Sequence, residues 1–263
     1  MPEGDTVWLT AHRLHRALAG RALTVSDFRI PQLATTDLRG VTVDEVLARG
    51  KHLLIRLAND FTLHAHLRMD GSWYLSRVGG PRPRRHREHL IRILLGNTEW
   101  LATGYRIHDL RFVTRDAEDT LVGHLGPDLL GPDWDAARAV ANLQAEPDRA
   151  IGEALLDQRV FAGVGNMYKC EILFLEHVHP WTPVRDVLDL RSVVDTSYRL
   201  LRANRDHPEQ STTGFVERGR EHWVYDRGGQ PCLRCRTTIE RADQGEPPRA
   251  RGTFWCPRCQ PRR

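Results

Sequence analysis

The sequence of 263 residues contains no apolar run that approaches the roughly 18 residues needed for a membrane-spanning helix. Its beginning also lacks a basic segment followed by a hydrophobic one, so we predict neither a membrane span nor a secretory signal and expect a cytoplasmic protein. Cysteine is scarce, with five residues, and without an export signal disulfide bonds are not expected. A composition of 40% hydrophobic and 27% charged residues excludes a disordered or fibrous chain and fits two or three small globular domains.

The first six residues place a proline and a carboxylate at the start of the chain. If Met1 is removed, as expected before a small second residue, Pro2 presents a secondary amine with a pKa of roughly 8. Asp5 and Thr6 are predicted N-caps of a helix whose apolar residues recur at 7, 11, 14 and 18. The positive helix terminus would disfavour protonation of the amine and favour the carboxylate of Glu3, giving a nucleophile beside a proton shuttle. An ordinary chain start remains the alternative for this stretch taken alone.

Short apolar or alternating segments follow, bounded by Gly, Pro, Asp and Asn, at residues 22–30, 41–47, 52–57, 61–67, 72–76, 90–95, 99–103 and 110–114. Short strands at this spacing predict an antiparallel sandwich or barrel covered by the first helix. Lys51 follows Gly50 at the mouth of one strand, where a solvated lysine is the default. His64 and His66 share one strand face, for which packing or phosphate contact is favoured over metal ligation. Residues 79–87 are predicted to form an exposed basic loop.

Helical spacing begins near residue 116, with helices predicted at 134–143, 151–156, from 171 onward and at 187–203, and a polar loop at 211–219. Gly163-Val164-Gly165-Asn166 forms a glycine-rich turn ahead of a helix. Backbone N–H groups in such a turn suit a phosphate oxygen, although tight helix packing also explains the glycines.

Four of the five cysteines form two pairs, Cys232-x2-Cys235 and Cys256-x2-Cys259, separated by twenty residues. This spacing predicts one tetrahedral zinc ion that is structural, because thiolates fill all four positions. Residues 224–263 also hold nine arginines and four acidic residues, so a basic end follows a nearly neutral body. A basic segment of this kind favours a nucleic-acid partner, with a solvated arginine-rich surface as the alternative. Cys170 is predicted to be a buried core residue.

Together these segments resemble the formamidopyrimidine-DNA glycosylase and endonuclease VIII family of base-excision repair enzymes over the whole chain. The resemblance rests on four stretches in the family's order: Pro2-Glu3-Gly4, Arg49-Gly50-Lys51-His52-Leu53-Leu54, Asp157-Gln158-Arg159 through Asn166, and Arg251-Gly252-Thr253-Phe254-Trp255-Cys256-Pro257-Arg258-Cys259-Gln260. It implies an α+β multidomain fold. We predict a helix-capped antiparallel β-sandwich that carries catalysis over 1–117, a linker and helix-two-turn-helix DNA-binding domain over 118–223, and a four-cysteine zinc-finger β-hairpin over 224–263.

The resemblance also implies a mechanism. Pro2 resembles the nucleophile that attacks C1′ of the damaged nucleotide and forms an iminium bond, and Glu3 resembles the general acid/base acting on the sugar ring. Lys51 matches a lysine that contacts phosphate at the lesion, whereas Arg251 and Asn166 match residues that grip phosphates beside the flipped nucleotide. Strand cleavage by β,δ-elimination would follow.

Further positions resemble DNA contacts of the family. Met69 resembles a residue that wedges into the vacated base stack, His66 and Tyr225 resemble phosphate contacts, and Arg111 resembles a second wedge or phosphate contact. Two departures stand out. Asp5-Thr6 replaces a common Pro-Glu and so removes a carboxylate, and residues 109–112 only partly match Asp-Pro-Arg-Arg-Phe-Gly.

The Pro-Glu-Gly opening and the short segment between Thr213 and Tyr225 resemble endonuclease VIII, which implies oxidised pyrimidines as substrates. A purine-directed glycosylase acting on 8-oxoguanine or formamidopyrimidines, and a zinc-dependent damaged-DNA-binding protein without catalysis, are the alternatives. The expected partner is double-stranded DNA with oxidised bases or abasic sites. We expect a monomer without membrane association that joins the nucleoid when bound to DNA.

Overall fold

The computed structural model describes residues 2–80, 85–248 and 250–262. It divides into two compact units, Met1–His124 and Leu125–Arg263, which we describe separately. The predicted basic loop at 79–87 lies partly outside the described residues, although a 3-10 helix, η2 (Arg85–Leu90), begins within it. The finer domain boundaries at 117 and 223 stay a prediction. In the described part, no helix has the length and apolarity needed to cross a membrane.

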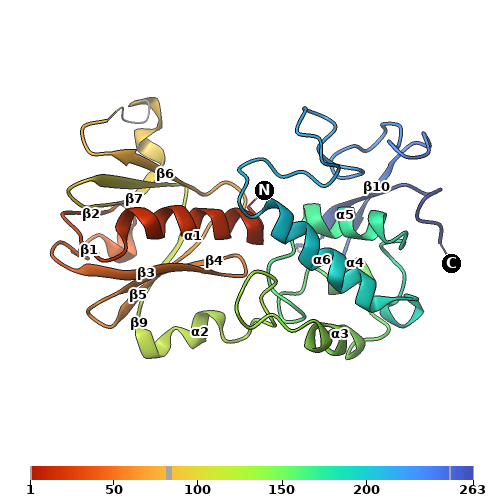
Figure 1. The fold of residues 1–263 in the computed structure, drawn as a ribbon, viewed down its shortest axis with the longest axis horizontal. Helices are drawn as coiled ribbons and strands as arrows, with labels where there is room; N and C mark the ends of the chain where they lie inside the picture. Colours follow the sequence, from red (N-terminus) through yellow and green to blue (C-terminus); the bar gives the residue numbers. More distant parts are fainter. Residues whose placement is uncertain (1, 81–84, 249, 263) are drawn as a thin grey trace. The chain divides into compact units, whose positions relative to one another are not determined.

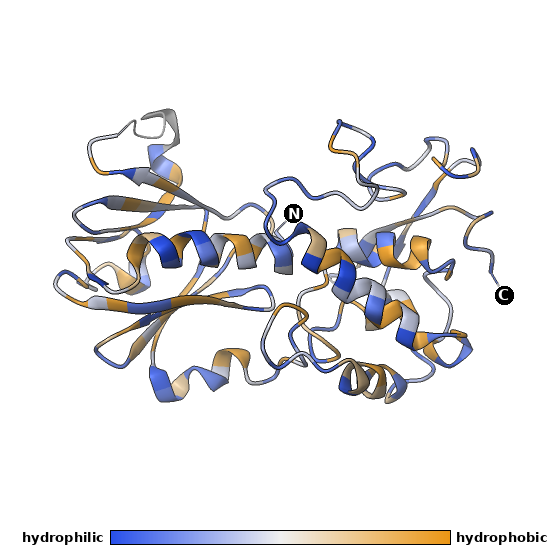
Figure 2. Ribbon diagram, viewed as in Figure 1, coloured by the Kyte–Doolittle hydropathy of each residue, from blue (hydrophilic) through white to orange (hydrophobic). Residues whose placement is uncertain are grey.

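Helix α1 (Gly4–Leu18) opens the first unit. Val7, Ala11, Leu14 and Leu18 are almost fully buried, so the predicted apolar spacing is confirmed. Figure 2 shows the hydrophobic and hydrophilic patches that alternate along this amphipathic helix.

The prediction that Asp5 and Thr6 cap helix α1 is wrong. Glu3 has the extended backbone of an N-cap and its carbonyl accepts from the Val7 amide at 3.0 Å, so both residues lie inside the first turn.

Two antiparallel sheets and α1 share the hydrophobic core of this unit. In Figure 1, α1 runs between them. The five-stranded sheet has the order β1 (Arg21–Ala22), β3 (Thr42–Arg49), β4 (His52–Leu57), β5 (Phe61–His66), β9 (Asp109–Thr114). The four-stranded sheet has the order β2 (Val25–Phe28), β7 (Ile91–Gly96), β8 (Trp100–Tyr105), β6 (Ser72–Arg77). Short elements complete the unit: η1 (Pro31–Leu33), η3 (Arg115–Ala117) and α2 (Asp119–Val122). The predicted helix-covered antiparallel sandwich is confirmed.

The second unit is helical with a terminal hairpin. Its elements are α3 (Ala136–Gln144), α4 (Ile151–Ala154), α5 (Asn166–Leu175), η4 (Val184–Asp186), α6 (Leu190–Asn204), β10 (Glu240–Gln244) and β11 (Arg251–Trp255). The helix predicted from residue 171 onward begins already at Asn166. Nine of its ten residues are buried, and a helix buried on every side has no amphipathic pattern to mark its start.

A buried carboxylate on α5 organises the segment that leads to the hairpin. Glu171 is fully buried, and its oxygens accept from the amides of Trp223, Val224 and Tyr225 at 2.7–2.8 Å. The Thr212 hydroxyl donates to the same group. The carboxylate thus accepts from three backbone amides that lie outside any strand or helix and would otherwise lack an acceptor. Sequence periodicity gave no sign of this contact, because its partners lie about fifty residues away in the chain.

Replacing Glu171 with alanine should therefore lower the free energy of unfolding of the second unit by at least about 3 kcal/mol, because three buried amides lose their acceptor. Urea denaturation measures the change. Glu209→Ala is the matched control, since this exposed glutamate should change stability by less than about 0.5 kcal/mol. Equal stability of the two variants would contradict the structural role of Glu171.

Candidate functional site

Strand register gathers polar side chains at one end of the five-stranded sheet. His52 is paired with His66 across β4 and β5, and His66 is paired with Asp109 across β5 and β9. The β3–β4 turn, with Gly50 and Lys51, adjoins this row. Lys51, His66 and Asp109 are therefore neighbours along one edge of the unit, although up to 58 positions separate them in the sequence.

The start of α1 lies at the same end of this unit (Figure 1). Ala19, just past the C-terminus of α1, bridges Val43 near the beginning of β3, and the Val46 amide donates to His15 Nδ1 at 3.1 Å. The 15-residue helix is about 22 Å long, and β3 covers a similar length from Val43 to its turn. Helix and strand run in opposite directions, so the helix N-terminus lies toward the turn that carries Lys51.

The chain start itself has the burial expected of a reactive site. Pro2 is half-buried and directly precedes the N-cap residue of α1, while Glu3 is fully buried. An anion at a helix N-terminus is favoured by the partial positive charge there. This arrangement places a carboxylate in a dry environment next to Pro2, the combination that proton transfer to a nearby amine requires.

Lys51 lies in a two-residue turn between β3 and β4, directly before β4, which is the strand mouth at which the sequence placed it. Gly50 has φ of 56°, a conformation that glycine adopts without steric cost, so this residue permits the tight turn. The turn holds the lysine at the rim of the sheet.

Four histidines cluster beside that turn, of which His52 and His124 escaped sequence analysis. His52 Nδ1 lies 2.8 Å from His64 Nε2, and the His52 ring contacts those of His66 and His124 with centroids 5.0 and 6.3 Å apart. Burial, followed by the neighbouring imidazoles, lowers the pKa of His52 to about 3. Burial, followed by Lys51 and Arg68, lowers the pKa of His66 to about 4. These side chains are therefore neutral near pH 7. The ring contacts and the short His52–His64 distance make this cluster a packing and hydrogen-bonding element of the sheet edge.

Two further residues with predicted roles lie at this edge. Met69 is 63% exposed in the turn that follows β5. Arg111, at the start of β9, is exposed, and its Nε lies 3.4 Å from Asp109 Oδ1. The exposed Met69 side chain is therefore accessible to a partner, and its predicted role as a wedge stays a prediction.

In the second unit, the glycine-rich turn precedes α5. An added Cβ at Gly163 would lie 3.1 Å from Leu201 Cδ2, and its φ is 119°, so helix packing accounts for this glycine. Asn166 begins α5 and is almost buried, and its Nδ2 donates to the Gly252 carbonyl at 2.8 Å. The side chain thus fastens α5 to the hairpin strand β11. Its predicted phosphate contact stays a prediction.

Arg251 and Tyr225 lie on the hairpin side of the same unit. Arg251 is exposed where β11 begins, paired in register with Gln244. Tyr225 is half-buried, and its ring packs against His222 and Phe254 with centroids 5.6 and 5.5 Å apart. Both predicted phosphate contacts stay predictions.

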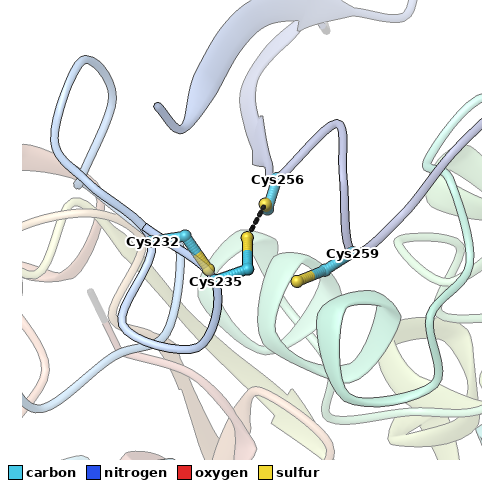
Figure 3. A group of neighbouring side chains, drawn as sticks. All are labelled: Cys232, Cys235, Cys256 and Cys259. Atoms are coloured by element: carbon cyan, nitrogen blue, oxygen red, sulfur yellow. Dashed lines mark hydrogen bonds between the residues drawn. The ribbon is translucent and has the colours of Figure 1, made fainter. Parts of the chain in front are cut away.

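Four cysteines lie together at the base of the hairpin (Figure 3). The sulfur atoms of Cys232, Cys235, Cys256 and Cys259 lie within 4.8 Å of one another. Burial raises the pKa of the Cys256 and Cys259 thiols, so these two become thiolates only with a cation beside them. The donor set fits one structural zinc ion, as the spacing predicted. Cys170 is fully buried in the neighbouring core, which confirms its assignment.

Comparisons with known proteins match this architecture in three segments. Residues 1–126 match the formamidopyrimidine-DNA glycosylase N-terminal domain, residues 125–201 match the H2TH domain of that glycosylase, and residues 229–262 match a zinc finger found in FPG and IleRS. The second and third matches confirm the predicted helix-two-turn-helix and the zinc finger.

Whole-chain relatives agree. A Streptomyces coelicolor protein named probable endonuclease 8 2 is 54% identical, with 99% of this chain and 94% of that protein covered. A Mycolicibacterium smegmatis protein named DNA-(apurinic or apyrimidinic site) lyase Nei2 is 46% identical, with 99% of both chains covered. The crystal structure of Lactococcus lactis formamidopyrimidine-DNA glycosylase bound to DNA containing an AP site has the same fold, with a TM-score of 0.80, 24% identity and coverage of 99% and 100%.

Replacing Cys256 with serine should reduce the zinc content from one ion per chain to none and expose the amides of β10 and β11 to hydrogen exchange. The strands of the first unit should keep their protection, since they form a separate unit. Elemental analysis and hydrogen exchange measure the two effects. Cys170→Ala removes a thiol outside the cluster and should keep one zinc; retention of zinc by Cys256→Ser would contradict the assigned ligand set.

Proposed function

This chain belongs to the formamidopyrimidine-DNA glycosylase and endonuclease VIII family, and we propose that it removes oxidised pyrimidines from DNA as a bifunctional glycosylase and AP lyase of base-excision repair. The observation that carries the proposal is the set of residues that meet at one end of the first unit. There the chain start, the buried Glu3 and the Lys51 turn lie at one edge of the sheet. DNA is the partner, as the family and the DNA-bound structural relative indicate.

The small number of amino groups in the chain supports Pro2 as the nucleophile. The chain contains only two lysines, Lys51 and Lys169. Lys169 is fully buried and donates its Nζ to Thr253 Oγ1, so it belongs to the packing of α5 against β11. Two amines therefore remain for covalent chemistry at an exposed DNA strand: the α-amine of Pro2 after removal of Met1, and Lys51.

In the proposed reaction, the Pro2 nitrogen forms a bond to C1′ while the N-glycosidic bond breaks; the electron pair of the broken bond leaves with the base, which takes up a proton. The nitrogen then loses its own N–H proton to the Glu3 carboxylate. Glu3 passes this proton to the ring oxygen as the C1′–O bond breaks, and the nitrogen lone pair forms the iminium ion. The iminium acidifies the C2′ hydrogens. Loss of a C2′ proton expels the 3′ phosphate, a second elimination expels the 5′ phosphate, and hydrolysis of the iminium releases the enzyme.

Phosphate contacts hold the substrate in this proposal. Lys51 is a point charge on a short turn, suited to one phosphate oxygen beside the lesion. His66 is neutral near pH 7 and donates from one ring nitrogen. In the second unit, Arg251 is exposed at the beginning of β11, and the Tyr225 hydroxyl and the backbone N–H groups before α5 are further donors. Asn166 is a further proposed phosphate contact, and its Nδ2 also donates to the Gly252 carbonyl and so fastens the hairpin.

The exposed turn after β5, which carries Met69, is proposed to act when the damaged nucleotide leaves the base stack. The target C1′ is out of reach inside a duplex, so the nucleotide leaves the stack at a cost of a few kcal/mol. Met69, 63% exposed, is proposed as the apolar side chain that fills the gap, and Arg111, exposed on β9, is proposed as a second wedge or phosphate contact.

Oxidised pyrimidines are the proposed substrates because the relatives described above are named endonuclease 8 or AP lyase. The segment from Thr213 to Tyr225 is also short, leaving little chain to cover a bulky purine. We further propose that the protein acts as a monomer in the cytoplasm and associates with the nucleoid when bound.

Cleavage of a set of duplexes tests the proposal. Thymine glycol and dihydrouracil duplexes should be excised at least tenfold faster than 8-oxoguanine duplexes, with phosphates left at both ends of the gap. Glu3→Gln should slow base excision by at least about 100-fold, because the proton donor is lost. A reversed preference would favour a purine glycosylase. Tight lesion binding without cleavage would favour the non-catalytic binding protein.

Arg251→Ala should weaken binding to all duplex sequences alike and reduce the slope of log K against log salt by about 1, because a phosphate contact carries no base information. Anisotropy titrations at several salt concentrations measure both. Arg258→Ala is the matched control, since this exposed arginine of the same finger has no proposed contact. A loss confined to some sequences would contradict the phosphate assignment.

A further inference from the structure

One carboxylate in the first unit binds arginines from two different segments. Asp109 Oδ2 accepts from Arg68 Nη2 at 2.7 Å, and Asp109 Oδ1 lies 3.4 Å from Arg111 Nε. The two arginine side chains are 62% and 58% exposed, whereas Asp109 is 16% exposed. A half-buried carboxylate thus holds two guanidinium groups that extend into solvent.

Arg68 begins a turn whose tip is Met69. The turn closes through the Gly71 amide, which donates to the Leu67 carbonyl at 2.9 Å. Arg68 has φ of 53°, a left-handed conformation that is uncommon for residues other than glycine and is adopted at some energetic cost. Two contacts hold it there: its amide donates to His66 Nδ1 at 3.0 Å, and its guanidinium is paired with Asp109.

Asp109 is well suited to the ionised state that this pairing needs. Its burial would raise its pKa, but the hydrogen bond from Arg68 and the charges of Arg68 and Arg111 outweigh burial and lower the pKa of this carboxyl below its usual value. Cross-strand pairing with His66 fixes Asp109 at the end of β9, so its position is independent of the turn. The carboxylate is therefore a rigid anchor for a strained and exposed segment.

This carboxylate also opposes the electrostatics of the surface. If this edge faces DNA, a negative charge there lowers affinity for phosphates, and Asp109 neutralises arginines that could otherwise contact them. A carboxylate at this place costs DNA affinity. Its presence is explained if its anchoring of the turn that carries Met69 contributes to the reaction.

We infer that Asp109 is a positioning residue for nucleotide extrusion, holding Arg68 in its left-handed conformation so that Met69 projects into the base stack. The inference rests on the proposed function. Met69 and Arg111 are proposed to enter the base stack or contact phosphate themselves, whereas Asp109 only positions the turn that carries Met69. It acts through Arg68 and touches no reacting atom.

Asp109→Asn tests the inference through two readouts of opposite sign on duplex DNA. Loss of one negative charge should tighten binding to undamaged duplex about twofold or more, measured by anisotropy at low salt. Loss of the anchor should slow single-turnover excision from a dihydrouracil duplex about tenfold, because the wedge is misplaced. A purely electrostatic role would move both readouts in the favourable direction, and a purely structural role would weaken both together with the thermal stability.

Two variants serve as controls. Asp70→Asn removes an equal charge from the same turn, where Asp70 is paired with Arg106 at 3.4 Å, and should tighten binding without slowing excision. Arg68→Gly breaks the ion pair with Asp109 and lets the backbone at this position sample both positive and negative φ. Met69 is then no longer held, so excision should slow even if Asp109→Asn folds poorly. The double variant Arg68→Gly/Asp109→Asn should be no slower than either single variant within about twofold, because both break one pair.

Unchanged excision in both Asp109→Asn and Arg68→Gly would overturn the inference. Additive losses in the double variant would also overturn it, since the two residues would then act separately. A wild-type protein that excises no lesion would instead overturn the proposed function, so the two failures are distinguishable.

Discussion

The register of one antiparallel sheet fixes the candidate active edge of this protein. His52 is paired with His66, and His66 with Asp109, so three strands present their ends in one row. A slip of one residue would turn every side chain of a strand to the opposite face. The buried leucines and Ile55 of β4 and β5 exclude such a slip, because it would bring His52 and His66 into the core and expose apolar residues. The hydrophobic pattern that folds the sheet is therefore the pattern that places Lys51, Met69 and Arg111.

The second unit depends on buried polar contacts of α5. Asn166 donates to Gly252, Lys169 donates to Thr253, and Glu171 accepts from three successive amides. A helix with fully buried lysine and glutamate is stable only when each group finds its partner. The zinc cluster holds the two ends of the hairpin, and α5 holds its middle. Arg251 therefore lies on a strand that is held both by the zinc cluster and by α5.

Much of this arrangement could be predicted from the sequence where the signal is local. The apolar spacing of α1, the strands of the sandwich and the two cysteine pairs depend on residues close together in the chain, and the structure confirms them. The N-caps of α1 and the start of α5 were predicted wrongly. A cap is decided by backbone angles, and α5 lacks an amphipathic pattern. Glu171, the His52–His64 contact and the Arg68–Asp109 pair could not be predicted, since their partners lie 12 to 54 positions apart and carry no motif.

The central claim is that the α-amine of Pro2 forms the covalent bond to DNA. Borohydride trapping on a dihydrouracil duplex, followed by mass spectrometry of the trapped peptide, tests it most directly because few amines compete. The account predicts the adduct on a peptide that begins with Pro2, and continued trapping by Lys51→Arg, which keeps the charge but removes the amine. An adduct on Lys51, or trapping by a form that retains Met1, would contradict it.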